Sequence, residues 1–196
     1  MAAETAMLSG LLASLGLAAI WLFARNRGMR APAPGETAPD FALADADGGE
    51  RRLADYRGAW LVLYFYPRDD TPGCTVEACA LRDAWAEFAA RDVAVLGLSL
   101  DPPGRHARFA AKHGLPFPLL SDPGGRVARR YAALLDLGVV RLARRHSYLI
   151  DPAGRVARRF APVSPRRHAR DILAALDEIL LEGSAGVSNN PDMPLR

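Results

Sequence analysis

The sequence is poor in cysteine and in lysine. Cys74 and Cys79 are the only cysteines among 196 residues, which is too few for the disulfide framework of a small secreted domain. Lys112 is the only lysine, so nearly all the positive charge is carried by arginine. The arginines are scattered among 22 acidic residues and the formal net charge is only +3, so no basic block indicates nucleic-acid binding.

Metal-binding patterns are also missing. The four histidines are dispersed along the chain, and they do not complete a zinc pattern with a single C-x4-C pair. They are His106, His113, His146 and His168. The sequence therefore predicts neither a metal site nor a bound cofactor.

One long uncharged run lies near the N-terminus. Met7–Ala24 holds 18 residues without a charge, and three arginines follow it before residue 31. This length is close to the shortest helix that spans a bilayer. A cleaved signal peptide is the rival interpretation, but its positive n-region is missing, since Glu4 stands there. A short interfacial extension is the third possibility.

We therefore predict a membrane anchor over residues 1–29. With the arginines on its C-terminal side, the positive-inside rule places the globular part in the cytoplasm, on a single-pass protein of the cytoplasmic membrane. The alternative is a soluble cytoplasmic protein. Residues 30–39 are rich in proline and should form an extended linker, 40–181 should form one globular domain, and the polar tail 182–196 should be disordered.

Within the globular part, strand and helix patterns alternate. A hairpin is expected around Asp47-Gly48-Gly49, a strong turn signal between short apolar runs. Apolar runs predict strands at Trp60–Tyr66, Val93–Leu100, Phe117–Asp122, His146–Asp151 and Arg155–Pro162. Apolar residues at helical spacing predict helices at Cys74–Ala90, Pro103–His113 and Pro165–Leu181. This order predicts an α/β sandwich with a mixed sheet.

Two nearly identical decapeptides occur in this region: DPGGRVARRY at Asp122–Tyr131 and DPAGRVARRF at Asp151–Phe160. The first runs on into AALLDLG, which favours a turn and then a helix. The second meets Pro162 at once, which favours a hairpin and a strand. We predict one sequence with two structures, decided by tertiary context.

Cys74 is the first candidate for chemistry. It follows a predicted buried strand and the turn PRDDTPG, and it lies at the N-terminal end of a predicted helix. Unpaired backbone N–H groups and the helix dipole stabilise an anion there, which favours the nucleophilic thiolate. Gly73 lets the backbone turn close to the sulfur, and Pro72 stiffens the approach.

Cys79 lies five residues further on, and three interpretations compete: a metal clip, a structural disulfide and a redox pair. In an intact helix the two Cα atoms would be roughly 8 to 9 Å apart. A disulfide needs less than about 7 Å, so bonding requires that end of the helix to unwind. The spacing suits two separate tasks, in which Cys74 reacts and Cys79 follows after a local opening. The plainer alternative is that Cys79 is a small buried apolar residue.

A family resemblance enters with these residues. YFYPRDDTPGCTVEACALRD, Tyr64–Asp83, closely resembles the active-site segment of peroxiredoxins, in particular the bacterioferritin comigratory protein (peroxiredoxin Q) subfamily. RHSYLID, Arg145–Asp151, is similar to the strand that brings an arginine to the same site. The resemblance covers roughly Pro32 to Leu181, and it implies a thioredoxin fold with an N-terminal hairpin.

The resemblance also implies roles for the matching residues. Cys74 would be the peroxidatic cysteine and Cys79 the resolving one, forming an intramolecular disulfide. Arg145 and Thr71 would hold the peroxide. The backbone N–H groups of Gly73 and Cys74 would complete the pocket, and Pro67 would keep water off the sulfur. Of the neighbouring polar residues, Asp69 and Asp70 are interpreted as turn-formers, and Glu77 as favourable to the helix dipole.

The expected function is thus a thiol peroxidase that reduces hydrogen peroxide and organic hydroperoxides and is recycled by thioredoxin or a similar dithiol. The alternative is a membrane-tethered thiol-disulfide oxidoreductase, and a redox-sensing or binding module is a third, non-enzymatic possibility. A disulfide exchanger needs neither Thr71 nor Arg145, so these residues favour the peroxidase. The globular part is expected to be monomeric.

Overall fold

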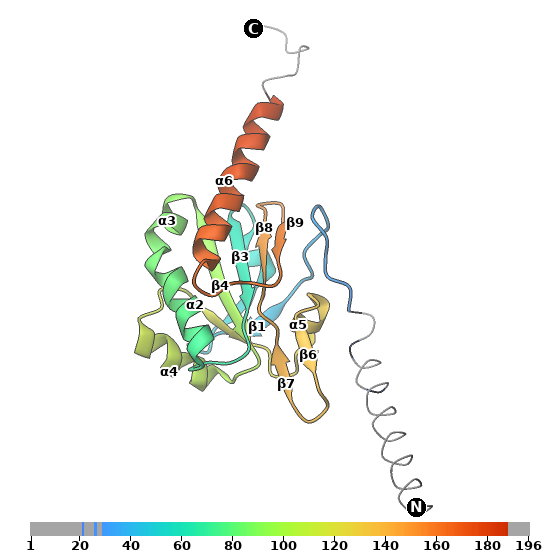
Figure 1. Ribbon diagram of the computed structural model, residues 1–196, viewed down its shortest axis with the longest axis vertical. Helices are drawn as coiled ribbons and strands as arrows, with labels where there is room; N and C mark the ends of the chain where they lie inside the picture. The colour runs from blue at the N-terminus through green and yellow to red at the C-terminus, as the bar shows by residue number, and fades with distance from the viewer. Residues whose placement is uncertain (1–20, 22–25, 27–28, 188–196) are drawn as a thin grey trace, which may run out of the picture.

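A computed structural model describes residues 21, 26 and 29–187, and these residues are coloured in Figure 1. Their centre is a five-stranded sheet in the order β5-β4-β3-β8-β9. The strands are β3 (Trp60–Phe65), β4 (Val93–Ser99), β5 (Leu119–Ser121), β8 (His146–Ile150) and β9 (Val156–Phe160). β3, β4 and β5 are parallel to one another, and β8 pairs antiparallel with both β3 and β9, so the predicted mixed sheet is confirmed.

The predicted N-terminal hairpin is also present. It pairs β1 (Ala42–Ala44) with β2 (Glu50–Arg52), and the short 3-10 helix η1 (Leu53–Tyr56) follows. The carboxylate of Asp45 holds the turn, because its Oδ1 accepts hydrogen bonds from the backbone N–H of Asp47 at 3.0 Å and of Gly49 at 2.8 Å.

Burial on both faces of β3 organises the core. Side chains alternate along a strand, so Leu61, Leu63 and Phe65 enter one apolar cluster and Val62 and Tyr64 the other. The first cluster is closed by the hairpin, η1 and α5 (Arg126–Arg130). The second is closed by α2 (Pro72–Asp83), α3 (Trp85–Ala90), α4 (Pro103–His113) and α6 (His168–Val187). Figure 1 shows α2 and α6 in front of the sheet.

The single helix predicted over Cys74–Ala90 is wrong, because the structure divides it at Ala84 into α2 and α3. Ala84 has φ −90° and ψ 6°, outside the helical region. No glycine or proline marks the break in the sequence. It follows from packing: α2 lies against α6, whereas α3 lies against β4, and one straight helix cannot follow both surfaces.

The last helix is longer than predicted. α6 begins at His168 and continues to Val187, so residues 182–187 are helical rather than part of a disordered tail. No proline interrupts this stretch, and its glycines weaken a helix without ending it. The remaining tail lies outside the described residues, as does the predicted anchor segment Met7–Ala24 apart from Trp21. Within the described part of the chain, no helix has the length and apolarity needed to cross a membrane.

The two decapeptides adopt two structures, as predicted. Both make a turn with a left-handed glycine, Gly125 at φ 65° and Gly154 at φ 75°. The first copy then forms α5, whose first N–H groups are capped by the Asp122 carboxylate. The second forms β9, where the N–H of Val156 donates to the carbonyl of Glu36 at 2.8 Å.

The sequence favoured a helix that runs on into AALLDLG, but the helix of the first copy ends before this segment. Ala132 adopts φ 49°, which ends the helical turn, and β6 (Leu134–Asp136) pairs with β7 (Arg141–Ala143) in a hairpin that was not predicted. Leu142 and Leu135 face each other across this pair, so cross-strand pairing decides the conformation.

Candidate active site

Cys74 is the third residue of α2 and its side chain is buried, with 1% exposed. Thr71 is the N-cap residue, in an extended conformation, and Pro72 occupies the first helical position, where its missing N–H costs nothing. The sulfur therefore lies in the first turn of the helix, where backbone N–H groups lack intrahelical partners. This is the position expected from the sequence.

The Arg145 guanidinium reaches this sulfur from the sheet. Arg145 directly precedes β8, its side chain is 19% exposed, and its Nη2 donates to Cys74 Sγ at 3.3 Å. A Cβ added at Gly73 would lie 3.2 Å from the same Nη2, so glycine leaves the room that the guanidinium occupies. The two neighbouring candidates are used elsewhere: Arg144 donates to the carbonyl of Leu134, and Arg141 pairs with Asp136.

Glu77 is a site residue whose importance sequence reasoning missed. It lies three residues after Cys74, on the same face of α2, and its side chain is fully buried. Its Oε2 accepts a hydrogen bond from Arg145 Nη1, so one guanidinium spans the sulfur and the carboxylate. Its Oε1 lies 2.9 Å from Nδ1 of His168, although the two atoms are not aligned as a hydrogen bond. An interpretation through the helix dipole alone is therefore insufficient.

The electrostatics of the site follow from this burial. Desolvation acts to lower the pKa of Arg145, but the charges of Glu77 and Cys74 outweigh it and raise that pKa above its ordinary value. Burial, followed by the nearby charge of Glu77, raises the pKa of Tyr64 well above its ordinary value. The guanidinium therefore stays charged and the phenol stays neutral.

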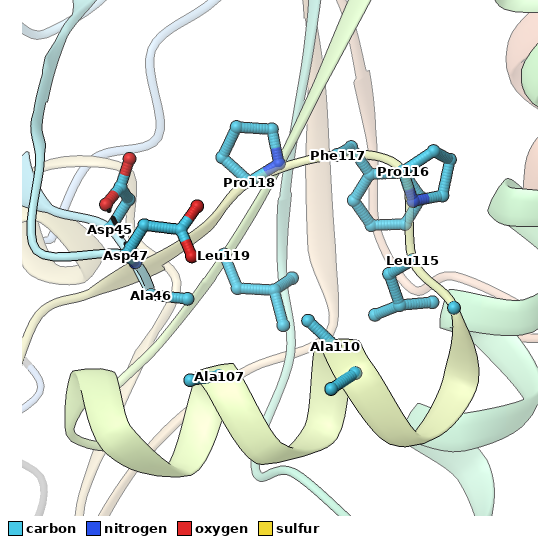
Figure 2. A pocket seen from close by; sticks show the side chains of 12 residues that line it. Asp45, Ala46, Asp47, Ala107, Ala110, Leu115, Pro116, Phe117, Pro118 and Leu119 are labelled. Atoms are coloured by element: carbon cyan, nitrogen blue, oxygen red, sulfur yellow. Dashed lines mark hydrogen bonds between the residues drawn. The ribbon is translucent and has the colours of Figure 1, made fainter.

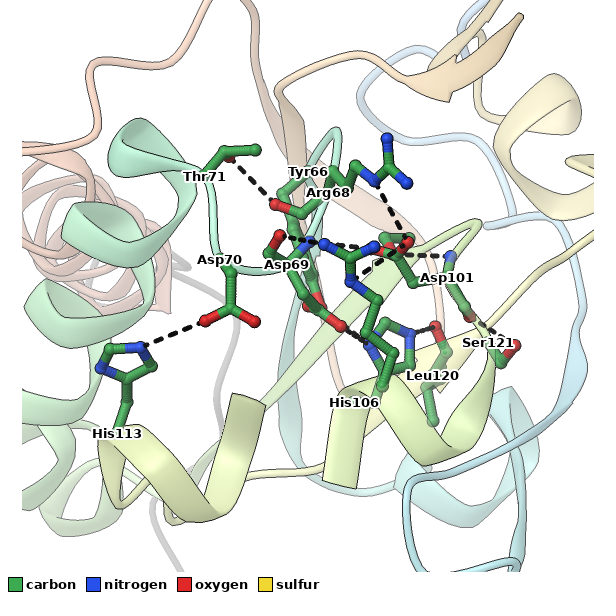
Figure 3. A network of polar contacts seen from close by, with 12 residues as sticks. Tyr66, Arg68, Asp69, Asp70, Thr71, Asp101, His106, His113, Leu120 and Ser121 are labelled. Atoms are coloured by element: carbon green, nitrogen blue, oxygen red, sulfur yellow. Dashed lines mark hydrogen bonds and ion pairs between the residues drawn. The ribbon is translucent and has the colours of Figure 1, made fainter. Parts of the chain in front are cut away.

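The loop before α2 is fixed by a second buried network, drawn in Figure 3. Asp69 is fully buried and accepts a hydrogen bond from Tyr66 Oη at 2.8 Å, while its other oxygen lies 2.8 Å from His106 Nδ1. Asp70, by contrast, is exposed, adopts φ 59° and pairs with Lys112 at 2.8 Å. The turn-former interpretation holds for Asp70 but is too simple for Asp69, whose carboxylate anchors the loop to the protein interior.

The other two sequence candidates in this loop lie just upstream of Cys74. Thr71 Oγ1 donates to the carbonyl of Arg68 at 3.0 Å, which fixes the hydroxyl within the loop. Pro67 is half-buried and lies two residues after the end of β3. Both therefore belong to the segment that the Asp69 network anchors.

Cys79 lies on α2 and is partly exposed. Both cysteines are free, and α2 is continuous from Pro72 to Asp83, so the helix is intact between them. Ideal helical geometry keeps their Cα atoms roughly 8 to 9 Å apart, beyond the reach of a disulfide. Bond formation would therefore require α2 to unwind locally.

Comparison with known proteins agrees with this geometry. The profile of the AhpC/TSA family matches residues 34–159. The chain belongs to the AhpC/TSA family. Among curated relatives, the putative peroxiredoxin bcp of Coxiella burnetii is 45% identical over 102 residues, which cover 52% of this chain and 68% of that protein. The chloroplastic peroxiredoxin Q of Gentiana triflora is 44% identical over 103 residues, 53% of this chain, and the match spans only about half, 48%, of that relative.

Solved structures of similar proteins agree with this family assignment. Peroxidoxin BcpB from Mycobacterium tuberculosis superposes with a TM-score of 0.72 at 36% identity, over 76% of this chain and 98% of that one. The bacterioferritin comigratory protein of Xanthomonas campestris, studied for its alkyl peroxide reduction activity, gives 0.66 at 33% identity, over 71% and 91%. The thioredoxin-like fold predicted from the sequence is thereby confirmed.

One surface groove of this AhpC/TSA family member lies away from Cys74. It has a volume of about 440 Å³ and runs between α4 and the segment before β5, as Figure 2 shows. Asp45 and Asp47 close one end, and the rest of the lining is apolar or backbone. Because the Asp45 carboxylate already binds Arg51 and the hairpin turn, this groove offers no chemistry comparable to the Cys74 site. Among the described residues, no cluster of acidic, histidine and cysteine side chains could hold a metal ion.

Proposed function

We propose that this chain is a thiol peroxidase that reduces hydrogen peroxide and organic hydroperoxides through Cys74. The observation that carries the proposal is the contact of 3.3 Å between Arg145 Nη2 and Cys74 Sγ at the start of α2. A cation and a helix N-terminus beside one sulfur favour the thiolate, and the same donors suit the oxygen atoms of a peroxide. The alkyl peroxide reduction activity named for the Xanthomonas campestris relative supports this substrate class.

In the first step, the Cys74 thiolate attacks one peroxide oxygen and the O–O bond breaks. The sulfur is oxidised to sulfenic acid, and the other oxygen leaves as water or an alcohol after it takes up a proton. Arg145 would stabilise the charge on both oxygens through its planar fork. Thr71 would position the peroxide by its hydroxyl, the N–H groups of Gly73 and Cys74 would bind it, and Pro67 would shield the sulfur from water.

In the second step, the thiol of Cys79 condenses with the sulfenic acid, which forms a disulfide and releases water. This step needs α2 to unwind between the two cysteines. Thioredoxin or a similar dithiol would then reduce the disulfide, be oxidised itself, and return both thiols.

The test is peroxide consumption by the full-length chain with thioredoxin and its reductase. Cys74→Ser should abolish turnover. Cys79→Ser should stop turnover while leaving one oxidation of Cys74 per chain, and it is the matched control. Turnover that survives Cys74→Ser would refute the proposal, and disulfide reduction without any peroxide turnover would favour a thiol-disulfide oxidoreductase.

Two further predictions from the sequence accompany this proposal. We propose that the full-length protein is held at the cytoplasmic membrane by its N-terminal segment, with the catalytic part in the cytoplasm. We also propose that the globular part is monomeric. Membrane fractionation and sedimentation test these points, and recovery of the full-length protein in the soluble fraction would refute the first.

A further inference from the structure

We propose that His168 is a positioning residue of the Cys74 site, which acts on the sulfur through Glu77 and Arg145. The inference rests on the proposed peroxidase function. It assigns a task to a buried histidine that the resemblance to peroxiredoxins did not bring into the site.

Four side chains from three elements meet here. Cys74 and Glu77 come from α2, Arg145 from the segment before β8, and His168 is the first residue of α6. His168 is 1% exposed and Glu77 is fully buried, so neither is solvated. Nδ1 of His168 lies 2.9 Å from Glu77 Oε1, while Arg145 occupies Oε2. Each oxygen of the carboxylate thus has a different neighbour, His168 at Oε1 and Arg145 at Oε2.

The imidazole ring is itself held in place. The ring of Tyr64 lies edge-on to it with the centroids 6.2 Å apart, and the ring of Phe160 lies at 6.4 Å. Among the described residues, neither ring nitrogen of His168 makes an aligned hydrogen bond, and Nδ1 lies 2.9 Å from Glu77 Oε1. The polar group that faces this histidine is therefore the Glu77 carboxylate, and the imidazole does not cap α6.

A fixed carboxylate fixes the guanidinium. Arg145 uses Nη1 for Glu77 and Nη2 for Cys74, and the planar guanidinium keeps these two donors in a constant geometry. A shift of Glu77 is therefore transmitted to the contact with the sulfur. His168 does not touch the reacting atoms, but it sets the position of the group that does.

The same contact bears on the second chemical step. Glu77 lies between Cys74 and Cys79 on α2, so unwinding that segment must pull its carboxylate away from His168 and Arg145. His168 therefore stabilises the wound helix. It should assist oxidation of Cys74 and oppose formation of the disulfide, two effects of opposite sign.

The test is single-turnover kinetics of the full-length chain, with rapid acid quench and mass spectrometry to follow the sulfenic acid and the disulfide separately. In His168→Ala, oxidation of Cys74 should slow by roughly tenfold, the scale expected when a buried carboxylate loses a polar neighbour, and disulfide formation should accelerate. His168→Asn should restore both rates, because its amide N–H can occupy the place of Nδ1.

Ile172→Ala is the matched control. Ile172 is fully buried on the same helix and its side chain has no polar atom, so this variant loosens the packing of α6 without removing a polar neighbour of Glu77. It should leave the ratio of the two rates unchanged. In a Glu77→Leu background, His168→Ala should cause no further change in the oxidation rate, since the carboxylate that links the two residues is gone.

Failure of this inference is distinct from failure of the proposed function. If the wild-type chain consumes no peroxide, the peroxidase proposal is lost. If the wild-type chain consumes peroxide, two results would show that His168 is only a packing residue. One is that Ile172→Ala reproduces the two opposite effects, and the other is that His168→Asn is as impaired as His168→Ala. If His168→Ala does not fold, the comparison of His168→Asn with the wild type decides: a rate ratio changed by tenfold overturns the inference, and a retained ratio supports it.

Discussion

The buried pair of Glu77 and Arg145 gives the strongest stability prediction. Arg145→Met keeps most of the side-chain length but removes the cation, and it leaves the fully buried Glu77 with His168 as its remaining partner. Removal of one member of a buried ion pair costs about 3 to 5 kcal/mol, because the remaining charge is uncompensated. For a chain of this size each kcal/mol lowers Tm by about 2 to 4 °C, so a loss of roughly 6 to 20 °C is expected.

The assays are urea unfolding, which gives the free energy, and thermal unfolding, which gives Tm, both of the full-length chain under reducing conditions and monitored by circular dichroism. Glu77→Leu combined with Arg145→Met should recover most of the loss, since two apolar side chains can replace a buried pair at little cost. Arg91→Met is the control, because Arg91 and Asp177 form a surface pair, 31% and 51% exposed, that should contribute little to stability. If Arg145→Met costs no more than Arg91→Met, Glu77 is not a buried charge that needs this partner.

Three further predictions concern stability. Burial and two neighbouring arginines lower the pKa of His146 from 6.5 to about 4, so the unfolded chain binds this proton more tightly. The free energy of unfolding should therefore fall as the pH drops from 6.5 to 4, by about 2 kcal/mol after allowance for partial exposure. In His146→Gln, the free energy measured by urea unfolding should depend less on pH over that range. Gly97→Ala should cost about 1 to 3 kcal/mol in the same assay, because the new Cβ would lie 2.7 Å from Tyr64 Oη; an unchanged midpoint would contradict the packing described. Asp69→Ala should cost about 1 to 3 kcal/mol, since it leaves the buried His106 and Tyr66 without their hydrogen-bond acceptor, and it should also slow peroxide turnover; a fully stable variant would show that the network does not hold the loop.

Hydrophobic periodicity predicted the regular elements because their signals are local. The helix Pro103–His113 has both of its bounds correct, since proline opens it and the left-handed Gly114 ends it. The break at Ala84 could not be predicted in this way. It has no signal in the local sequence and depends on which surface each half of the helix meets.

In the candidate site too, residues in local motifs could be predicted, whereas residues whose contacts depend on packing could not. Cys74 and Arg145 could be selected because each belongs to a specific motif. His168 is far from both in the sequence and gives no local sign of its role, because the contact depends on the docking of α6 against α2. A glutamate three residues after a cysteine, on the buried face of a helix, is the one signal that could have drawn attention to Glu77.

The two decapeptides show a limit of assigning secondary structure from short segments of sequence. Gly124 against Ala153 and Tyr131 against Phe160 are their only differences, so ten residues cut from either place would carry nearly the same intrinsic preferences. The information that makes one a helix and the other a strand therefore resides in the surrounding protein. The two copies thus form an internal control, because a method that assigns secondary structure from short sequence windows must be wrong for one of them. The extent of that error measures how much of the fold is determined by residues outside the window.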